Sequence, residues 1–295
     1  NLTKNTQASG EASIALGVNT KATGKQALAM GSDAQAKEEA SIALGVNAVS
    51  ENGIAIGKDS TSGKDASVSV GLGANSNAGG IAVGKNAKSK SATSIGIGEG
   101  AIANANSVVI GTNTNSGTGT KSVLIGDGSS VGTPTPGLAG NATGVISIGQ
   151  NAGKDSAGPN LMSTINLGSN TKVGDAARTT GKVAQSIAIG SGNSPGQGAW
   201  ARGDQSISIG SDTESTGDSS IAIGGDDLNS VSSSSASYTK KTFDKAGTQT
   251  VTQNISTNLN NIYKDLTGRT EGLGSGVYRG TNSGQGAVAL GVKAK

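Results

Sequence analysis

Residues 14–45 read IALGVNTKATGKQALAMGSDAQAKEEASIALG, and one short motif occurs three times in this stretch. The motif is an aliphatic residue, a small residue, a second aliphatic residue and a glycine. It continues along the chain in fifteen copies, which begin at Ile14, Leu28, Ile42, Ile54, Val68, Ile81, Ile95, Val108, Val123, Ile146, Ile165, Ile187, Ile207, Ile221 and Val288. From Gly17 to Gly126 the motif glycines are 12 to 15 residues apart. Such regular spacing predicts a repeat protein with one coil per motif.

The residues after each motif glycine also repeat. Two positions later comes a residue that tolerates positive φ, such as Asn19, Asp33 or Asn47, and small residues follow at the third and fifth positions. Each unit is therefore expected to hold two short strands joined by two tight turns. A coil of about 14 residues predicts an all-β fold, a narrow roll of two parallel sheets in which each coil pairs with the next. Its stability must come from stacking.

The alternation within the motif assigns residues to two faces. We predict that the aliphatic residues form the core of the roll, namely Ile14, Leu16, Ile42, Leu44, Ile54, Ile56, Val68, Val70, Ile95, Ile97, Ile187, Ile189, Ile207, Ile209, Ile221 and Ile223. The residue between them is never charged in the fifteen copies. We therefore predict that it packs closely against another chain, through Ala15, Ala29, Ala43, Ala55, Ala82, Ala188 and Ala222. The alternative is a small-residue face that is merely exposed.

Composition excludes several classes of protein. The 295 residues include 49 Gly but one Trp, three Tyr and one Phe, which is too little large apolar mass for a single globular core of this length. There is no His and no Cys, so His-based acid–base catalysis, Cys nucleophiles and the common zinc sites are excluded. The net charge of +3 is spread along the chain without basic clusters or stacking aromatics. We predict no enzyme activity, no cofactor, no metal and no nucleic-acid partner.

The segments Ser13–Gly17, Ser186–Gly190 and Ser220–Gly224 resemble the Ser-Val/Ile-Ala-Ile/Leu-Gly repeats of the YadA-like head of trimeric autotransporter adhesins. The resemblance covers residues 1–224 and returns at 284–295. It implies a left-handed parallel β-roll with three identical chains around one axis. It also implies display on the surface of a Gram-negative bacterium, with membrane attachment only through a C-terminal anchor that lies outside this chain.

The resemblance further implies adhesion. Family members attach to host matrix proteins of the collagen or fibronectin type, to cells, to other bacteria with autoagglutination, or to inert surfaces. Two other functions remain open from the sequence. The rod could be a passive spacer that holds a binding tip away from the cell. An ice-binding β-solenoid is the third possibility, although the flat Thr-x-Thr ladder expected of one is missing.

Two regions depart from the regular repeat of residues 1–126. Within 127–224 the glycine spacing lengthens to 23, 19, 22 and 20 residues, and the extra residues at 127–145, 150–164, 169–186 and 191–206 are expected to form loops on one side of the rod. These loops could carry recognition or be neutral decoration. Residues 225–283 form an insertion with a Ser-rich run at 230–237. Val251, Ile255, Leu259, Ile262 and Leu266 then predict an amphipathic helix at about 250–266, before the repeat resumes at 284–295.

The last long loop contains the candidate binding residues. Arg202, Gly203 and Asp204 spell the tripeptide that integrins read, and Trp200 is the only tryptophan. The alternative is structural, because Gly203–Ser206 occupies the place that Gly10–Ser13 fills in the first repeat. In that interpretation Asp204 is an ordinary turn residue.

Overall fold

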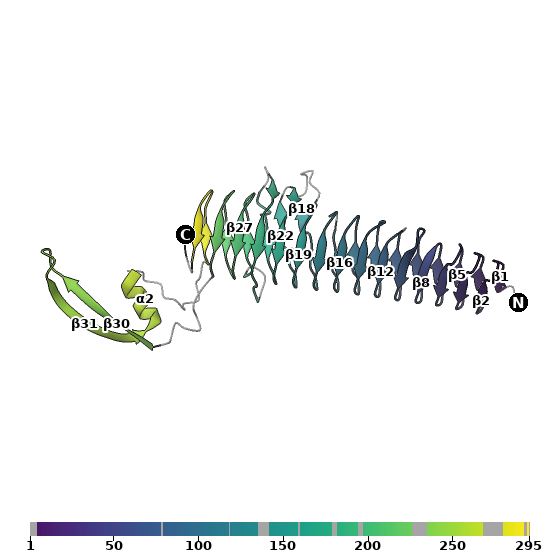
Figure 1. Ribbon diagram of the computed structural model, residues 1–295, viewed down its shortest axis with the longest axis horizontal. Helices are drawn as coiled ribbons and strands as arrows, with labels where there is room; N and C mark the ends of the chain where they lie inside the picture. The colour runs from purple at the N-terminus through teal and green to yellow at the C-terminus, as the bar shows by residue number, and fades with distance from the viewer. Residues whose placement is uncertain are drawn as a thin grey trace.

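A computed structural model of the chain describes residues 5–77, 79–117, 119–134, 142–158, 160–178, 182–193, 197–225, 235–267, 280–291 and 294. Short strands stack one behind another along a rod, and the two ends of the chain lie at opposite ends of this stack (Figure 1). Loop residues 135–141, 159, 179–181 and 194–196, and residues 226–234 of the Ser-rich segment, lie outside the described residues.

The main sheet is parallel, and every one of its fifteen strands contains the first three residues of one motif copy. We call it the aliphatic sheet. Its strands in spatial order are β2 (Ile14–Leu16), β4 (Leu28–Met30), β6 (Ile42–Leu44), β8 (Gly53–Ile56), β10 (Ser67–Val70), β12 (Ile81–Val83), β14 (Ile95–Ile97), β16 (Val108–Ile110), β17 (Val123–Ile125), β19 (Ile146–Ile148), β22 (Ile165–Leu167), β25 (Ile187–Ile189), β27 (Ile207–Ile209), β29 (Ile221–Ile223) and β33 (Val288–Leu290). The predicted parallel stacking of the motifs is confirmed.

A second set of two-residue strands forms the other side of the roll. Eight of them make one parallel sheet: β1 (Gln7–Ala8), β3 (Lys21–Ala22), β5 (Gln35–Ala36), β7 (Val49–Ser50), β9 (Thr61–Ser62), β11 (Asn75–Ser76), β13 (Lys88–Ser89) and β15 (Ile102–Ala103). Four more make a sheet nearer the C-terminus: β23 (Lys172–Val173), β26 (Trp200–Ala201), β28 (Glu214–Ser215) and β32 (Asn282–Ser283). In both sheets equivalent positions of successive repeats are paired, as Lys21 is with Gln35.

The motif glycines form the corners where the chain leaves the aliphatic sheet. Gly71 has φ +134°, and a Cβ built there would lie 2.5 Å from the carbonyl oxygen of Gly84 in the next coil. Successive coils approach so closely at this corner that no side chain fits. Two residues later the chain turns again at positive φ, as at Asn47 (φ 57°) and Asp59 (φ 57°). The predicted turn positions are therefore confirmed.

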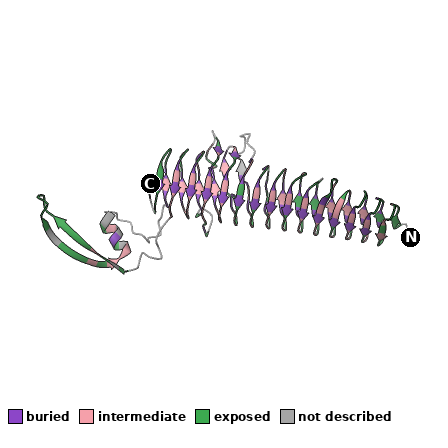
Figure 2. Cartoon of the chain, in the orientation of Figure 1, coloured by how far each residue is buried: buried purple, intermediate pink, exposed green. Residues whose placement is uncertain are grey.

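The predicted assignment of the two faces is wrong. Ala29, Ala43, Ala55, Ala82, Ala188 and Ala222, predicted to meet another chain, are fully buried inside the single chain, and Ala15 is half-buried. None of the sixteen aliphatic residues predicted as core is buried: each is half-exposed or exposed, and Ile56 and Ile97 are both 37% exposed. Figure 2 shows this alternation repeating along the rod. In the regular coils the buried side chains are almost all Ala, Ser and Thr, so the two sheets lie close together and the aliphatic residues point outwards.

Serine hydroxyls take part in this narrow interior. Ser69 Oγ donates to the carbonyl oxygen of Thr61 at 2.7 Å and lies 2.7 Å from Ser76 Oγ across the roll. Ser60 Oγ donates to the carbonyl oxygen of Gly57 at 2.8 Å. These bonds satisfy hydroxyl groups that would otherwise be costly to bury. Serine can therefore occupy these interior positions without leaving its hydroxyl unpaired.

The long insertions widen the roll. Four short strands, β18 (Thr133–Pro134), β20 (Ala157–Gly158), β21 (Leu161–Met162) and β24 (Val183–Ala184), pair in two further parallel sheets. We call residues 122–218 the wide coils and residues 14–110 the regular coils. The wide coils bury aliphatic side chains completely or almost so: Leu124, Val131, Val145, Leu161, Val173 and Val183. The insertions are thus more than surface loops, because they add a conventional hydrophobic core.

The insertion after residue 225 forms an antiparallel ribbon and one helix. β30 (Ser235–Phe243) pairs with β31 (Gln249–Asn258), and α2 spans Leu259–Thr267. The predicted helix over 250–266 is therefore wrong for its first half. A spacing of four also keeps Val251 and Ile255 on one face of a strand, and the β-branched residues of this segment favour strand over helix. Among the described residues of the insertion, the helix contacts the ribbon through Lys240 Nζ and Asp265 Oδ1, 2.9 Å apart.

Candidate functional site

The predicted binding residues belong to a polar cluster on the outer side of the wide coils. Register places Lys172, Trp200 and Glu214 side by side on the neighbouring strands β23, β26 and β28. Lys172 and Glu214 each stand four residues past a motif glycine, where the side chain points away from the interior. We call this group the Arg202 cluster; it comprises Lys172, Asp175, Arg178, Trp200, Arg202, Asp204, Glu214 and Asp218.

Arg202 links three successive coils. Its Nε donates to Asp175 Oδ2 at 3.0 Å, and its Nη2 donates to the same oxygen. Its Nη1 donates to Glu214 Oε1 at 2.7 Å. The guanidinium therefore bridges a carboxylate in the preceding coil and another in the following coil. These bonds raise the pKa of Arg202, even though its burial acts in the opposite direction.

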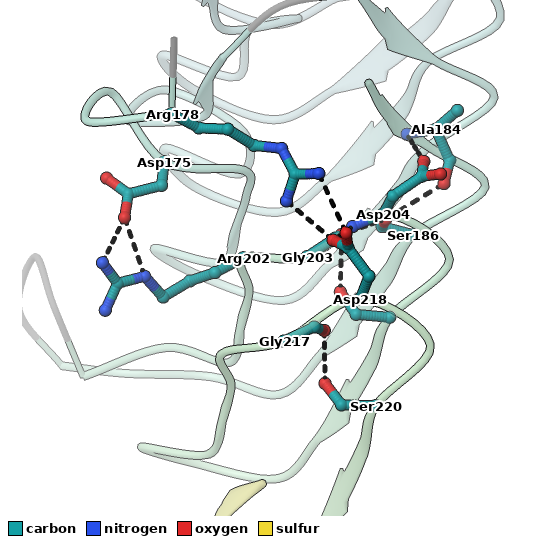
Figure 3. A network of polar contacts seen from close by, with 11 residues as sticks. Asp175, Arg178, Ala184, Ser186, Arg202, Gly203, Asp204, Gly217, Asp218 and Ser220 are labelled. Atoms are coloured by element: carbon teal, nitrogen blue, oxygen red, sulfur yellow. Dashed lines mark hydrogen bonds and ion pairs between the residues drawn. The ribbon is translucent and has the colours of Figure 1, made fainter. Parts of the chain in front are cut away.

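A second arginine spans a longer distance in sequence. Arg178 Nη1 and Nη2 donate to the two oxygens of Asp218 at 2.7 and 3.1 Å, across 40 residues (Figure 3). The two bonds from Arg178 hold the pKa of Asp218 below its usual range. Asp218 Oδ1 also accepts a hydrogen bond from the backbone N–H of Asp204 at 2.8 Å. One carboxylate thus joins two further segments of the wide coils.

The tripeptide at 202–204 is built into the roll. Gly203 is buried, and its carbonyl oxygen accepts hydrogen bonds from Ser186 Oγ and Ser206 Oγ, both at 2.8 Å. Asp204 Oδ1 accepts from the backbone N–H of Ala184 at 2.7 Å. A glycine packed against the next coil cannot stand at the tip of a recognition loop. The geometry therefore favours the structural interpretation of this motif.

Trp200 is held between two cations. Lys172 Nζ lies 3.5 Å and Arg202 Cζ 4.3 Å from the centre of the indole ring, a contact that stabilises both partners. Trp200 Nε1 donates to the carbonyl oxygen of Gly174 at 2.6 Å. Burial among these groups lowers the pKa of Lys172. The ring is therefore fixed by its neighbours and half-buried.

An open depression of about 270 Å³ lies beside the cluster, lined by Asp175, Ala177, Arg178, Arg202 and Thr216. The charged groups around it are already paired with one another, since both arginines bind carboxylates. Within the described ranges, no group of three Asp or Glu side chains is placed to hold a metal ion. The arrangement joins coils, and its chemistry is that of a structural polar network.

The second candidate surface is the outer face of the aliphatic sheet. Its residues form an apolar ladder along the rod, from Ile14 (59% exposed) through Ile125 (37%) and Ile148 (38%) to Leu290 (72%). A continuous apolar surface of this length is typical of a protein–protein interface. The sixteen aliphatic residues predicted as core, Ile14 among them, belong to this ladder, but sequence reasoning placed them inside. It missed Lys172, Asp175, Arg178 and Asp218 altogether, although the spacing of Lys172 and Glu214 from motif glycines could have revealed their alignment.

α2 is the only helix among the described residues, and at nine residues it is far too short to cross a membrane. The described segments therefore include no membrane-spanning helix.

Comparison with known proteins agrees with this architecture. The family model of the YadA head domain repeat (2 copies) matches residues 8–34, 22–48, 196–213 and 201–226. The first two matches lie in regular coils, and the last two contain the Arg202–Asp204 segment. A search of curated proteins gives no match. YadA heads are structural, adhesin-type domains of surface-exposed autotransporters anchored in the outer membrane, and such adhesins form homotrimers. The matches near the start of the rod and at residues 196–226 support a YadA-like head domain of a trimeric autotransporter adhesin in this chain.

Proposed function

We propose that this chain is the adhesive head of a fibre on the surface of a Gram-negative bacterium and that it works as a homotrimer. The observation that carries the proposal is the aliphatic sheet, whose fifteen strands present an apolar ladder outside a single-chain interior made largely of Ala, Ser and Thr. Such a ladder is unfavourable in water, so another surface of matching length must cover it.

A second and third copy supply that surface. In a closed symmetric assembly each chain presents the same ladder to the axis, and Ile42, Ile54 and Val68 of one copy meet the same level of the others. The in-register pairing of these residues along the sheet keeps the ladder straight. The family's left-handed roll with 14-residue coils fits this arrangement. The homotrimer thus buries the residues that the single chain leaves exposed.

Adhesion then belongs to the remaining surface, which is the outer side of the two-residue strands and of the wide coils. Lys21, Gln35, Thr61 and Lys88 occupy equivalent outward positions there. Three such surfaces, each repeated from coil to coil, give many weak contacts that add up to avidity. The proposed partners are host matrix proteins of the collagen or fibronectin type, cells, other bacteria, including autoagglutination, and inert surfaces.

Two measurements test the proposal. Mass in solution, by light scattering or sedimentation, is expected to be three times that of one chain, and a monomer at every concentration would contradict it. The purified protein is then tested against collagens, fibronectin, laminin, cells and plastic, with heat-unfolded protein as control. Binding above that control is expected for at least one surface.

A passive spacer is the competing function, and one observation favours it. The cluster richest in aromatic and charged groups, around Arg202, is satisfied by bonds within the chain. A trimer that binds none of the surfaces would establish the spacer. A trimer that binds would place recognition on the outer side of the rod, and Lys21→Glu and Lys88→Glu variants would then show whether the regular coils carry it.

A further inference from the structure

We infer that the wide coils are a self-supporting folding unit that forms within the single chain, whereas the regular coils require association with other copies. The dependence of the regular coils on other copies rests on the proposed homotrimer. The independent folding of the wide coils rests only on the side chains that they bury within one chain.

The regular coils bury little apolar surface inside one chain. Among the described residues before Val109, every buried hydrophobic residue is an alanine. The large apolar side chains of these coils, such as Leu16, Met30 and Leu72, are 60%, 42% and 45% exposed. A stack of this kind gains little from burial until a partner covers its aliphatic sheet.

The wide coils differ in their interior. Leu124, Val131, Val145, Leu161, Val173 and Val183 are at most 1% exposed in the single chain and belong to one cluster of buried residues. They come from successive repeats, so the cluster ties several coils together. A core of this kind needs no second chain, because its apolar surface is already removed from water.

The wide coils also contain the most buried ion pairs of the described chain. Arg202 with Asp175 and Glu214, and Arg178 with Asp218, join coils through side chains that are 20–41% exposed. In the regular coils, Lys37 with Glu51, Lys58 with Asp59 and Lys85 with Glu99 form pairs whose side chains are 39–63% exposed. Exposed pairs of that type contribute little, whereas partly buried networks hold their partners in place.

The wide coils lie between flanking coils on both sides. Repeat proteins fold by adding neighbours to a formed unit, and the wide coils offer strands for this at both ends. β17 pairs Val123 with Val108 of the regular coils, and β27 pairs Ile207 with Ile221 on the other side. A folded wide segment therefore presents ready edges on which flanking coils assemble when copies associate.

The test uses the full chain made unable to associate. Ile56→Lys, Ile148→Lys and Ile209→Lys together place charges on the outer face at three levels of the rod, where three copies would bring like charges together. Hydrogen exchange by mass spectrometry is then read separately for the two segments. We expect a monomer in which amides of the wide coils stay protected while those of residues 14–110 lose protection.

Two further variants in the same background keep the result interpretable. Leu161→Ala removes a buried side chain of the wide coils and is expected to lower their protection and shift Trp200 emission. Leu72→Ala removes a leucine that is already exposed in the regular coils and should leave the wide coils unchanged.

Any other result of the exchange experiment contradicts part of the inference. Monomers in which neither segment is protected contradict the self-supporting unit, and monomers in which both are protected contradict the dependence of the regular coils on association. A triple variant that still associates contradicts the aliphatic sheet as the interface, and hence the proposed homotrimer and the contrast drawn from it.

Discussion

At the scale of single residues, backbone geometry explains why glycine recurs where it does. The corner at Gly71 combines a left-handed backbone with the carbonyl oxygen of Gly84 at a distance that a Cβ atom cannot tolerate. The same contact recurs at Gly45 against Gly57. The motif glycine is therefore required by the stacking distance between coils, and composition alone would have suggested only flexibility.

Substitution of Gly71 by alanine is expected to destabilise the regular coils by about 1–3 kcal/mol from backbone strain, with the clash against Gly84 adding to it. Thermal unfolding followed by circular dichroism measures the effect. The matched control is Gly284→Ala, because a Cβ at Gly284 meets nothing within 4 Å. Equal melting temperatures for the two variants would contradict the proposed corner geometry.

Asp218 makes the wide coils sensitive to acid. Its two hydrogen bonds from Arg178 lower its pKa in the fold, whereas in the unfolded chain the value returns to about 3.9. The ionised carboxylate therefore stabilises the fold fully above about pH 4, and this contribution is lost as the pH falls through the lowered folded-state pKa. Because the pair is partly exposed, the contribution is about 1 kcal/mol at most.

Asp218→Asn should accordingly be less stable than the parent at pH 7, and the difference should shrink at pH 3. Urea unfolding followed by the emission of Trp200, the only tryptophan, measures both values. Glu38→Gln is the control, since Glu38 is exposed and lies in the regular coils. A difference between parent and Asp218→Asn that is independent of pH would refute the assigned ion pair.

At the scale of the element, alternation identifies which residues share a face but not which face is inside. The motif of β6 is consistent with Ile42 and Leu44 pointing inwards and with the opposite arrangement. Apolar character argued for the first choice, and the narrow spacing of the two sheets enforces the second. The residue between them, Ala43, is small because it lies fully buried between the two sheets.

Ala43→Leu is expected to destabilise the regular coils by about 1–3 kcal/mol or more, because the interior has no space for a larger side chain. Ile42→Ala, next to it in β6, should instead weaken association and leave the fold of a coil intact. Sedimentation and circular dichroism together separate the two effects. The reverse result, with Ala43→Leu tolerated, would restore the original assignment of faces.

The segment after residue 225 shows that one apolar spacing can fit either a helix or a strand. A spacing of four positions places Val251 and Ile255 on one face of a helix and equally on one face of a strand. The antiparallel partner Ser235–Phe243 decides in favour of strand β31, and the helix begins only at Leu259. No local sequence pattern predicts this partner strand, because β30 is largely polar and precedes the apolar series that begins at Val251.

At the scale of the whole molecule, two kinds of interior share one rod. The regular coils have a thin core of small residues, and the wide coils have a core of Val and Leu. The aliphatic sheet runs past both without interruption. One interface therefore serves segments whose stabilities in the single chain differ.

Association at the aliphatic sheet makes stability depend on concentration. The melting temperature of the regular coils should rise as protein concentration increases, because folding and assembly are coupled there. Differential scanning calorimetry over a hundredfold range of concentration measures the shift. The triple lysine variant should show none, and a concentration-independent parent would argue against coupled assembly.

The sequence by itself determined the repeat, its period, the fifteen strands of one parallel sheet and the turns at positive φ. These features are local, since each depends on residues within one coil and on the backbone geometry that they allow. Even the resemblance to the YadA-like head follows from five-residue segments such as Ser13–Gly17. Only the tertiary structure decided which face is inside, because that depends on the distance between two sheets. It also decided that Arg202 and Asp204 have a structural role. Their partners Asp175, Glu214 and Ala184 lie 12 to 27 residues away in the sequence and meet them only when the coils stack.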